Sequence, residues 1–104
     1  MRLKDQVAIV TGAAKGLGRE FAFGMAKEGA KIMAVTRKDL ANLEKTVKEI
    51  EAMGGVAKAL QADVSIEKDA IKMAEETVKV FGRIDILVNC AAIYDGLIRK
   101  SFTE

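Results

Sequence analysis

Short apolar runs alternate along this chain with longer segments in which apolar residues recur at every third or fourth position. Runs of this length predict strands, and the helical spacing predicts amphipathic helices. The runs lie at residues 6–11, 31–36, 56–62 and 84–89, and the helical segments at residues 16–27, 40–53 and 66–81. A further helix is expected from about residue 95. Strand and helix therefore alternate from residue 6 onward.

The helical segments have recognisable apolar stripes, starts and ends. One stripe consists of Leu17, Phe21 and Met25, and the clearest one of Leu40, Leu43, Val47, Ile50 and Met53. Asp39 and Ser65 precede two of the helices, and their side-chain oxygens are expected to cap the first-turn N–H groups. Helix ends are expected at Gly29, Gly54 and Gly82, because glycine adopts the conformation that stops a helix.

Alternating strands and helices joined by short turns are typical of α/β proteins, in which right-handed crossovers produce parallel strands. Residues 84–89 are almost uniformly apolar, as in strands that are buried on both faces. We therefore expect one domain over residues 1–104, a Rossmann-like doubly wound parallel sheet of strand order 3-2-1-4 that is truncated after the fourth strand. This is one half of such a sheet plus the first strand beyond its switch point.

A glycine-rich turn joins the first strand to the first helix, with the spacing Thr11-Gly12-x-x-x-Gly16-x-Gly18. Glycines let a backbone bend tightly and bring its N–H groups close to an anion, and a helix N-terminus adds a positive partial charge. The turn therefore suggests a dinucleotide or another phosphate-bearing ligand. A plain strand-to-helix turn, with glycines for packing alone, is the alternative that this motif leaves open.

Composition excludes several classes of function. Half of the 104 residues are hydrophobic, the net charge is only +2, and the aromatic residues are four Phe and one Tyr. Without a basic stripe and interleaved aromatics, nucleic acid is not expected as a partner. The chain has no His and one Cys, which argues against a metal site and excludes an internal disulfide or a His-dependent triad. Cys90 is expected to fill the core, with a reactive thiol as the alternative.

The chain also lacks the patterns of secretion and membrane insertion. Its first six residues are mostly polar and lead straight into a strand, unlike a signal peptide. No apolar run approaches the roughly 20 residues that a membrane-spanning helix needs. A cytoplasmic protein without membrane contact is therefore the expectation.

Three motifs in the expected order resemble those of the short-chain dehydrogenases/reductases. They are the glycine turn, the Asp63-Val64 pair after the third strand, and the segment Leu87-Val88-Asn89-Cys90-Ala91-Ala92-Ile93 after the fourth. The segment departs from the family pattern at Cys90, in place of a second Asn, and at Ala92, in place of a Gly. The resemblance covers essentially the whole chain and implies a cofactor-binding fold.

The resemblance also implies a role for each matching residue. Gly12, Gly16 and Gly18 would line the pyrophosphate turn, with Leu17 offering its backbone N–H. Asp63 would accept a hydrogen bond from the adenine amino group, and Val64 would meet the ring through its backbone. Asn89 would anchor the strand end, and Ala91 would lie beside the cofactor ribose. For Asp63 taken alone, a residue that precedes a helix is the alternative.

Basic residues favour NADP over NAD as the cofactor. An acidic side chain after the second strand would hold the ribose 2′-hydroxyl of NAD, but Thr36-Arg37-Lys38 stands there. Arg37 can bind a 2′-phosphate in bidentate fashion, and Lys15 in the glycine turn adds a second cation. Both features resemble NADP-preferring members of the family. Solvated surface charges are the alternative, and helix capping explains the acidic Asp39 more simply than a 2′-hydroxyl contact.

No catalytic residue carries over from the family, whose chemistry uses a Ser, a Tyr and a Lys four residues after that Tyr. The only tyrosine here is Tyr94, and the residue four positions later is Ile98. The chain is thus expected to be the cofactor-binding part of an oxidoreductase that transfers hydride between NADPH and a carbonyl or alcohol carbon, inactive by itself. A non-catalytic nucleotide-binding module and a self-associating fragment without ligand remain alternatives.

The fourth strand implies a partner, because a sheet that stops there leaves an apolar edge with unpaired N–H and C=O groups. Either a missing C-terminal half or a second copy of the chain is expected to cover this edge. A homo-oligomer is the expectation for the chain alone.

Overall fold

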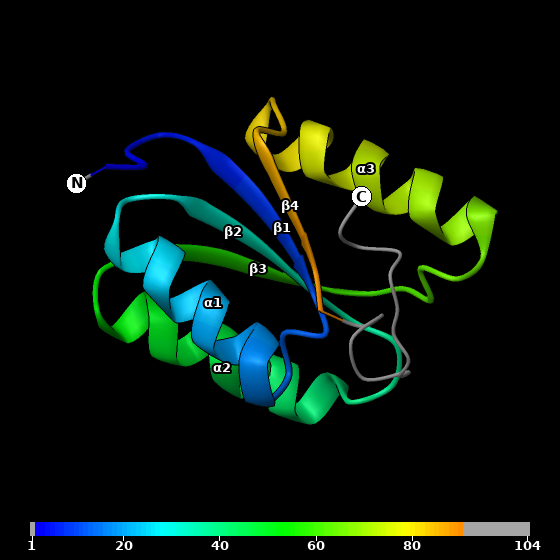
Figure 1. Ribbon diagram of the computed structural model, residues 1–104, viewed down its shortest axis with the longest axis horizontal. Coiled ribbons are helices and arrows are strands. Elements are labelled where there is room, and N and C mark those ends of the chain that lie inside the picture. The colour runs from blue at the N-terminus through cyan, green and yellow to red at the C-terminus, as the bar shows by residue number, and fades with distance from the viewer. Residues whose placement is uncertain (1, 91–104) are drawn as a thin grey trace.

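The computed structural model describes residues 2–90 of the chain, and within them strands and helices alternate (Figure 1). The strands are β1 (Val7–Thr11), β2 (Lys31–Thr36), β3 (Val56–Gln61) and β4 (Ile86–Asn89), and the helices are α1 (Gly16–Lys27), α2 (Leu40–Ala52) and α3 (Glu67–Phe81). All seven elements expected within these residues are present. The largest difference is at β4, which begins at residue 86 rather than 84. The further helix expected from about residue 95 lies outside the described residues.

The four strands form one parallel sheet in the order β3-β2-β1-β4, which confirms the predicted α/β fold and strand order. At the centre of the sheet, Val10 of β1 pairs with Ala34 of β2 and with Val88 of β4. Because all strands run in the same direction, their carboxyl ends meet along one edge of the sheet. Segments that follow different strands are thereby brought together there.

Helices cover both faces of the sheet, with α1 and α2 on one side and α3 on the other (Figure 1). Alternate residues of β1 point to opposite faces, so that Ala8 and Val10 pack in one core cluster and Ile9 in the other. Every residue of β1 is buried. This burial on both faces explains the unbroken apolar run of the first strand.

Helix α1 buries a different face from the one that its large apolar residues suggest. Leu17 and Phe21 are 46% and 43% exposed, whereas the buried positions are Gly18, Ala22 and Ala26. The predicted face of α1, which contains Leu17 and Phe21, is therefore rotated by one residue, or about 100°, from the face that is buried. Small residues lie against the sheet because they let the helix backbone approach β1 and β2 closely.

Strand β4 is not buried on both faces as predicted. Among the described strands it pairs only with β1, and Leu87 is 59% exposed. Nearby, the turn before β4 and helix α3 also carry exposed apolar side chains, at Ile84, Ile71, Val78 and Val80. The edge strand of the sheet and helix α3 thus each expose apolar side chains.

One of the two predicted helix caps is wrong. Asp39 caps α2, since its carboxylate accepts a hydrogen bond from the Asn42 backbone N–H at 3.4 Å. At α3 the N-cap position is Ile66, which makes no side-chain cap bond. The Ser65 hydroxyl instead donates to the Asp63 carboxylate at 2.6 Å. The Ser65 side chain does not cap α3, because the Asp63 carboxylate two residues earlier competes with the helix N-terminus for it.

Asp85 links the start of β4 to β1. Its Oδ2 accepts a hydrogen bond from the Val7 backbone N–H at 2.8 Å, and its Oδ1 accepts one from Arg83 at 2.8 Å. The Arg83 hydrogen bond, followed by that of Val7, lowers the pKa of the Asp85 carboxyl. The folded protein therefore favours the ionised carboxylate.

This shift predicts an acid-dependent contribution to stability. Because the pKa is lower in the folded state, the stabilisation is fully present above about pH 4 and is lost as the pH falls through the lower folded-state pKa. We expect Asp85→Asn to unfold at lower urea concentration than wild type at pH 7, with the difference shrinking in acid. Glu51→Gln, at an exposed site on α2, is the control. An Asp85→Asn difference that stays constant with pH would contradict the assignment.

Candidate functional site

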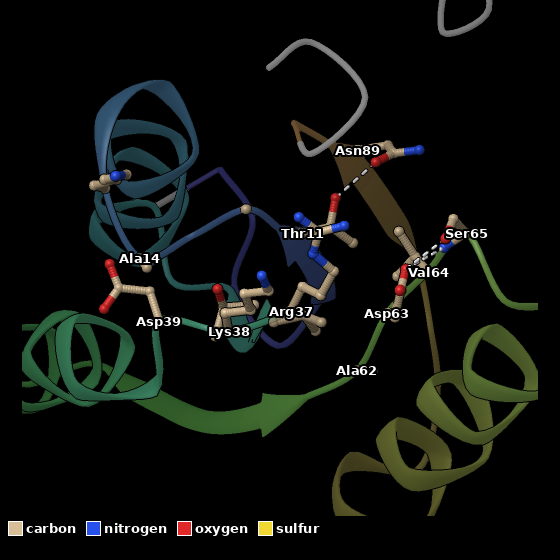
Figure 2. A pocket seen from close by; sticks show the side chains of 14 residues that line it. Thr11, Ala14, Arg37, Lys38, Asp39, Ala62, Asp63, Val64, Ser65 and Asn89 are labelled. Atoms are coloured by element: carbon tan, nitrogen blue, oxygen red, sulfur yellow. Dashed lines mark hydrogen bonds between the residues drawn. The ribbon is translucent and has the colours of Figure 1, made fainter. Parts of the chain in front are cut away.

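A cavity of about 450 Å³ opens at the carboxyl ends of the strands. Its walls come from the glycine turn after β1, the segment after β2, the segment after β3 and the end of β4. In the view of Figure 2, Arg37, Lys38 and Asp39 lie on one side, and Asp63, Val64 and Ser65 on the other. This is the place where open parallel α/β sheets bind their ligands.

The glycine turn has the backbone shape that its sequence suggests. Gly12 and Gly16 have φ angles of 67° and 61°, in the left-handed region that favours glycine. Gly18, in the first turn of α1, lies so close to the preceding turn that an added Cβ would be 2.1 Å from the Gly12 carbonyl oxygen. Only a residue without a side chain permits this approach, which brings the N-terminus of α1 to the end of β1.

The segment after β2 contributes a basic wall. Thr36, the last residue of β2, is buried, while Arg37 and Lys38 are exposed and line the cavity. The Gln61 side chain donates to the Arg37 carbonyl oxygen at 3.1 Å, which ties this segment to the end of β3. Lys15 of the glycine turn lines the same cavity. Three cationic side chains therefore border one space.

Asp39 also lines this wall, but its carboxylate serves the helix. Its Oδ1 accepts from the Asn42 backbone N–H, and its Oδ2 accepts from the Asn42 side-chain amide at 2.8 Å. The hydrogen bond from the Asn42 side chain is the main cause of its lowered pKa, with smaller contributions from Lys15 and Lys45. Both carboxylate oxygens are thus held by one residue of α2.

Asp63 is held in place after β3 by its neighbours. Its Oδ1 accepts from the backbone N–H of Ser65 at 3.0 Å and from the Ser65 hydroxyl, and its own backbone N–H donates to Asp69 at 2.9 Å. The Ser65 hydrogen bonds lower the pKa of Asp63. These bonds use one carboxylate oxygen, so Oδ2 can accept a hydrogen bond from a ligand in the cavity.

The ends of β1 and β4 are joined at the cavity by side chains. The Thr11 hydroxyl donates to the Asn89 side-chain oxygen at 2.8 Å (Figure 2). Directly after Asn89, Cys90 is fully buried, and burial raises the pKa of its thiol. A buried, protonated thiol fits the role of a small core residue rather than a reactive one.

The structure brings together most of the predicted site residues. Those that line the cavity are Gly12, Lys15, Thr36, Arg37, Asp63, Val64 and Asn89. Gly16, Leu17 and Gly18 form the start of α1 and shape the turn without lining the cavity. Ala91 lies outside the described residues. Lining residues absent from the predicted site are Thr11, Ala14, Val35, Lys38, Asp39, Ala62 and Ser65. Their position beside the carboxyl end of a strand is the signal that identifies them.

Residues 2–90 contain no group of three or more His, Cys, Asp or Glu side chains that could hold a metal ion. None of the helices α1 to α3 is long and apolar enough to cross a membrane.

Comparisons with known proteins find relatives that match nearly the full length of this chain. The sequence model of the short chain dehydrogenase family matches residues 6–104. An uncharacterized oxidoreductase of Methylorubrum extorquens is 40% identical over 103 residues, which are 99% of this chain and 42% of that protein. Tetrahydroxynaphthalene reductase of Pyricularia oryzae is 34% identical over 91 residues, 88% of this chain and 32% of that protein. The chain thus spans less than half the length of these relatives.

Solved structures of a short-chain oxidoreductase and of a dehydrogenase also superpose on this chain. A hydroxysteroid dehydrogenase from Escherichia coli superposes with a TM-score of 0.81 at 34% identity, over 85% of this chain and 37% of that one. A metagenomic short-chain oxidoreductase in complex with NADP superposes with a TM-score of 0.78 at 33% identity, over 84% of this chain and 39% of that one.

The close approach at Gly18 yields a mutational prediction. Gly18→Ala places a methyl group against a backbone oxygen that cannot move aside, so we expect the free energy of unfolding to fall by about 3 kcal/mol. Gly24→Ala is the matched control, since this exposed glycine of the same helix has no atom within 4 Å of an added Cβ. Alanine there should stabilise the helix by about 0.5–1 kcal/mol. Urea unfolding measures both, and equal behaviour of the two variants would contradict the packing described.

Proposed function

Because the chain belongs to the short chain dehydrogenase family, we propose that its cavity binds the adenosine half of NADP(H). The whole protein would then be an NADP(H)-dependent oxidoreductase, and residues 1–104 its cofactor-binding half-domain. When bound, the nicotinamide cofactor supplies or accepts a hydride at a carbonyl or alcohol carbon of a substrate. The chain's own residues would bind and orient that cofactor.

The observation that carries this proposal is the set of cations on one cavity wall. Arg37, Lys38 and Lys15 border the space next to Thr36, and no carboxylate takes the place at the end of β2 that would hold a 2′-hydroxyl. Arg37 is suited to a 2′-phosphate because its guanidinium offers several N–H donors in one plane. The acidic Asp39 serves as the N-cap of α2, since Asn42 donates to both of its carboxylate oxygens, so capping rather than a 2′-hydroxyl contact accounts for this residue.

The other walls suit the rest of the dinucleotide. The glycine turn and the N-terminus of α1 would take the pyrophosphate, because exposed backbone N–H groups and the helix dipole favour an anion there. Asp63 would accept a hydrogen bond from the adenine amino group through Oδ2, with the Val64 backbone beside the ring. Asn89, whose side-chain oxygen accepts from the Thr11 hydroxyl, would anchor the end of β4 beside the cofactor. A metagenomic short-chain oxidoreductase that is 33% identical to this chain was solved in complex with NADP, which supports NADP as the cofactor.

We further propose that the chain alone does not catalyse the reaction. Its single tyrosine, Tyr94, has no lysine four residues later, so the sequence lacks the pair that the family uses for proton transfer. Binding of the cofactor and catalysis are therefore separable, and binding is the function to measure first.

Reversal of charge at Arg37 tests the choice of cofactor. We expect Arg37→Asp to weaken NADPH binding by about 10- to 100-fold, the usual effect of losing hydrogen bonds to a charged group, and to leave NADH binding nearly unchanged. Isothermal titration with both cofactors gives the ratio of affinities. Lys72→Asp makes the same change in net charge at an exposed site on α3 and should leave the ratio as it is. An unchanged ratio in Arg37→Asp would refute the assignment.

For the 104-residue chain by itself, we propose self-association through the edge of β4. An edge strand presents unpaired backbone groups that can pair with another strand, and a second copy of β4 related by a twofold axis would pair antiparallel to it. Leu87, at 59% exposure, adds apolar area to this edge. A homodimer would cover both features.

Sedimentation velocity tests this assembly. The wild-type chain should form dimers at high concentration, and Leu87→Lys should shift them toward monomers, because a charged side chain on an edge strand opposes pairing. Ile71→Lys, at a site on α3 that is 51% exposed, should not. A wild-type monomer at every concentration, or dissociation by the α3 variant alone, would rule out the β4 interface.

A further inference from the structure

Thr46 is a buried hydroxyl residue in the middle of α2 that contacts the glycine turn. Its side chain has no exposed surface. Its hydroxyl oxygen lies 3.1 Å from the carbonyl oxygen of Ala13, 33 residues earlier in the chain, and 3.2 Å from that of Asn42 in its own helix. The hydroxyl therefore donates a hydrogen bond that joins α2 to the turn between β1 and α1.

Ala13 lies in the glycine turn, between glycines whose backbone must be held in one conformation. It stands between Gly12 and Gly16, whose backbones are the most flexible in an unfolded chain. Its N–H donates to the Val35 carbonyl of β2 at 3.2 Å, and its carbonyl accepts from Thr46. The two polar groups of one residue are thus held by two different elements, a strand on one side and a helix on the other.

The same hydrogen bonds reach the basic wall of the cavity. Asn42, whose carbonyl is the second acceptor for Thr46, donates twice to Asp39, and Asp39 lines the cavity beside Lys38. On the other side, Gly12 and Ala14 line the cavity next to Ala13. A partly buried chain of hydrogen bonds therefore connects the turn proposed for the pyrophosphate with the wall proposed for the 2′-phosphate.

From this geometry we propose that Thr46 is a positioning residue that holds the glycine turn in its phosphate-binding shape. The inference rests on the proposed function, because the phosphates in question are those of the cofactor. Thr46 itself does not line the cavity, so its effect on binding passes through the position of the Ala13 carbonyl. A turn held in advance loses less freedom when an anion binds to its N–H groups.

The chain offers a matched control in Thr77 of α3. Thr77 is also fully buried, and its hydroxyl donates to the carbonyl four residues earlier, that of Met73, at 2.8 Å. Thr46 makes the same bond to Asn42. The two threonines differ in that the single hydroxyl hydrogen of Thr46 is shared between the Asn42 carbonyl and the Ala13 carbonyl of the glycine turn. Replacing each by valine removes the same bond within the helix, but only one replacement releases the turn.

The experiment compares Thr46→Val, Thr46→Ser and Thr77→Val in the full chain. We expect Thr46→Val to weaken NADPH binding about fivefold, as for the loss of one hydrogen bond. It should also speed hydrogen exchange of the backbone amides of residues 12–18 in the chain without cofactor. Thr46→Ser keeps the hydroxyl and should retain most of the affinity. Thr77→Val should lower the free energy of unfolding to a similar degree. It should leave the NADPH affinity and the amide exchange rates of residues 12–18 at their wild-type values.

Two results would overturn the inference. One is Thr46→Val with wild-type exchange in residues 12–18, which would show that the turn holds its shape without the hydroxyl. The other is an equal change of exchange and affinity in Thr46→Val and Thr77→Val, which would reflect a general loss of stability. If the wild-type chain does not bind NADPH, the proposed function fails, and the exchange rates still decide whether Thr46 restrains the turn.

Discussion

The site depends on one close contact, between the first turn of α1 and the carbonyl of Gly12. An added Cβ at Gly18 would come within 2.1 Å of that oxygen, so the contact exists only because the residue is glycine. Through this contact the helix N-terminus meets the end of β1, and the turn that carries Lys15 borders the cavity. The small buried residues Ala22 and Ala26 continue the close approach along α1. Any side chain at residue 18 would displace the helix and the turn together.

The two sides of the sheet differ in how completely they are packed. On the α1 and α2 side, the core cluster is built largely from alanines, with Ile32, Leu43 and Ile50 between them, and buried polar contacts such as that of Thr46 join its elements. On the α3 side the cluster is smaller, and the nearby edge exposes Leu87. Both clusters contribute to the cavity lining, Ala14 from the first and Val35, Ala62 and Val64 from the second, while the β4 edge offers the surface for a further chain segment or a second copy.

Much of the fold could be predicted because its signals are local. Strand length, helical spacing and glycine ends follow from neighbouring residues, and the parallel order follows from their alternation. The errors arose where tertiary context decides. The buried face of α1 consists of small residues, which hydrophobic spacing does not reveal, and Ser65 found a nearer acceptor than the helix it precedes. Thr46 reads as an ordinary polar residue in an amphipathic helix. Its contact with Ala13 becomes visible only when residues 33 positions apart are placed together.

The central claim is that the cavity at the strand ends binds NADP(H), and NMR can test it directly. In a titration of the ¹⁵N-labelled chain with NADPH, we expect saturable shifts of the amide signals of the glycine turn, of Arg37 and Lys38, and of Asp63 to Ser65. NADH should cause smaller shifts at Arg37 and Lys38, because it lacks the 2′-phosphate. Shifts confined to α3 and β4, or no saturable shift with either cofactor, would contradict the account.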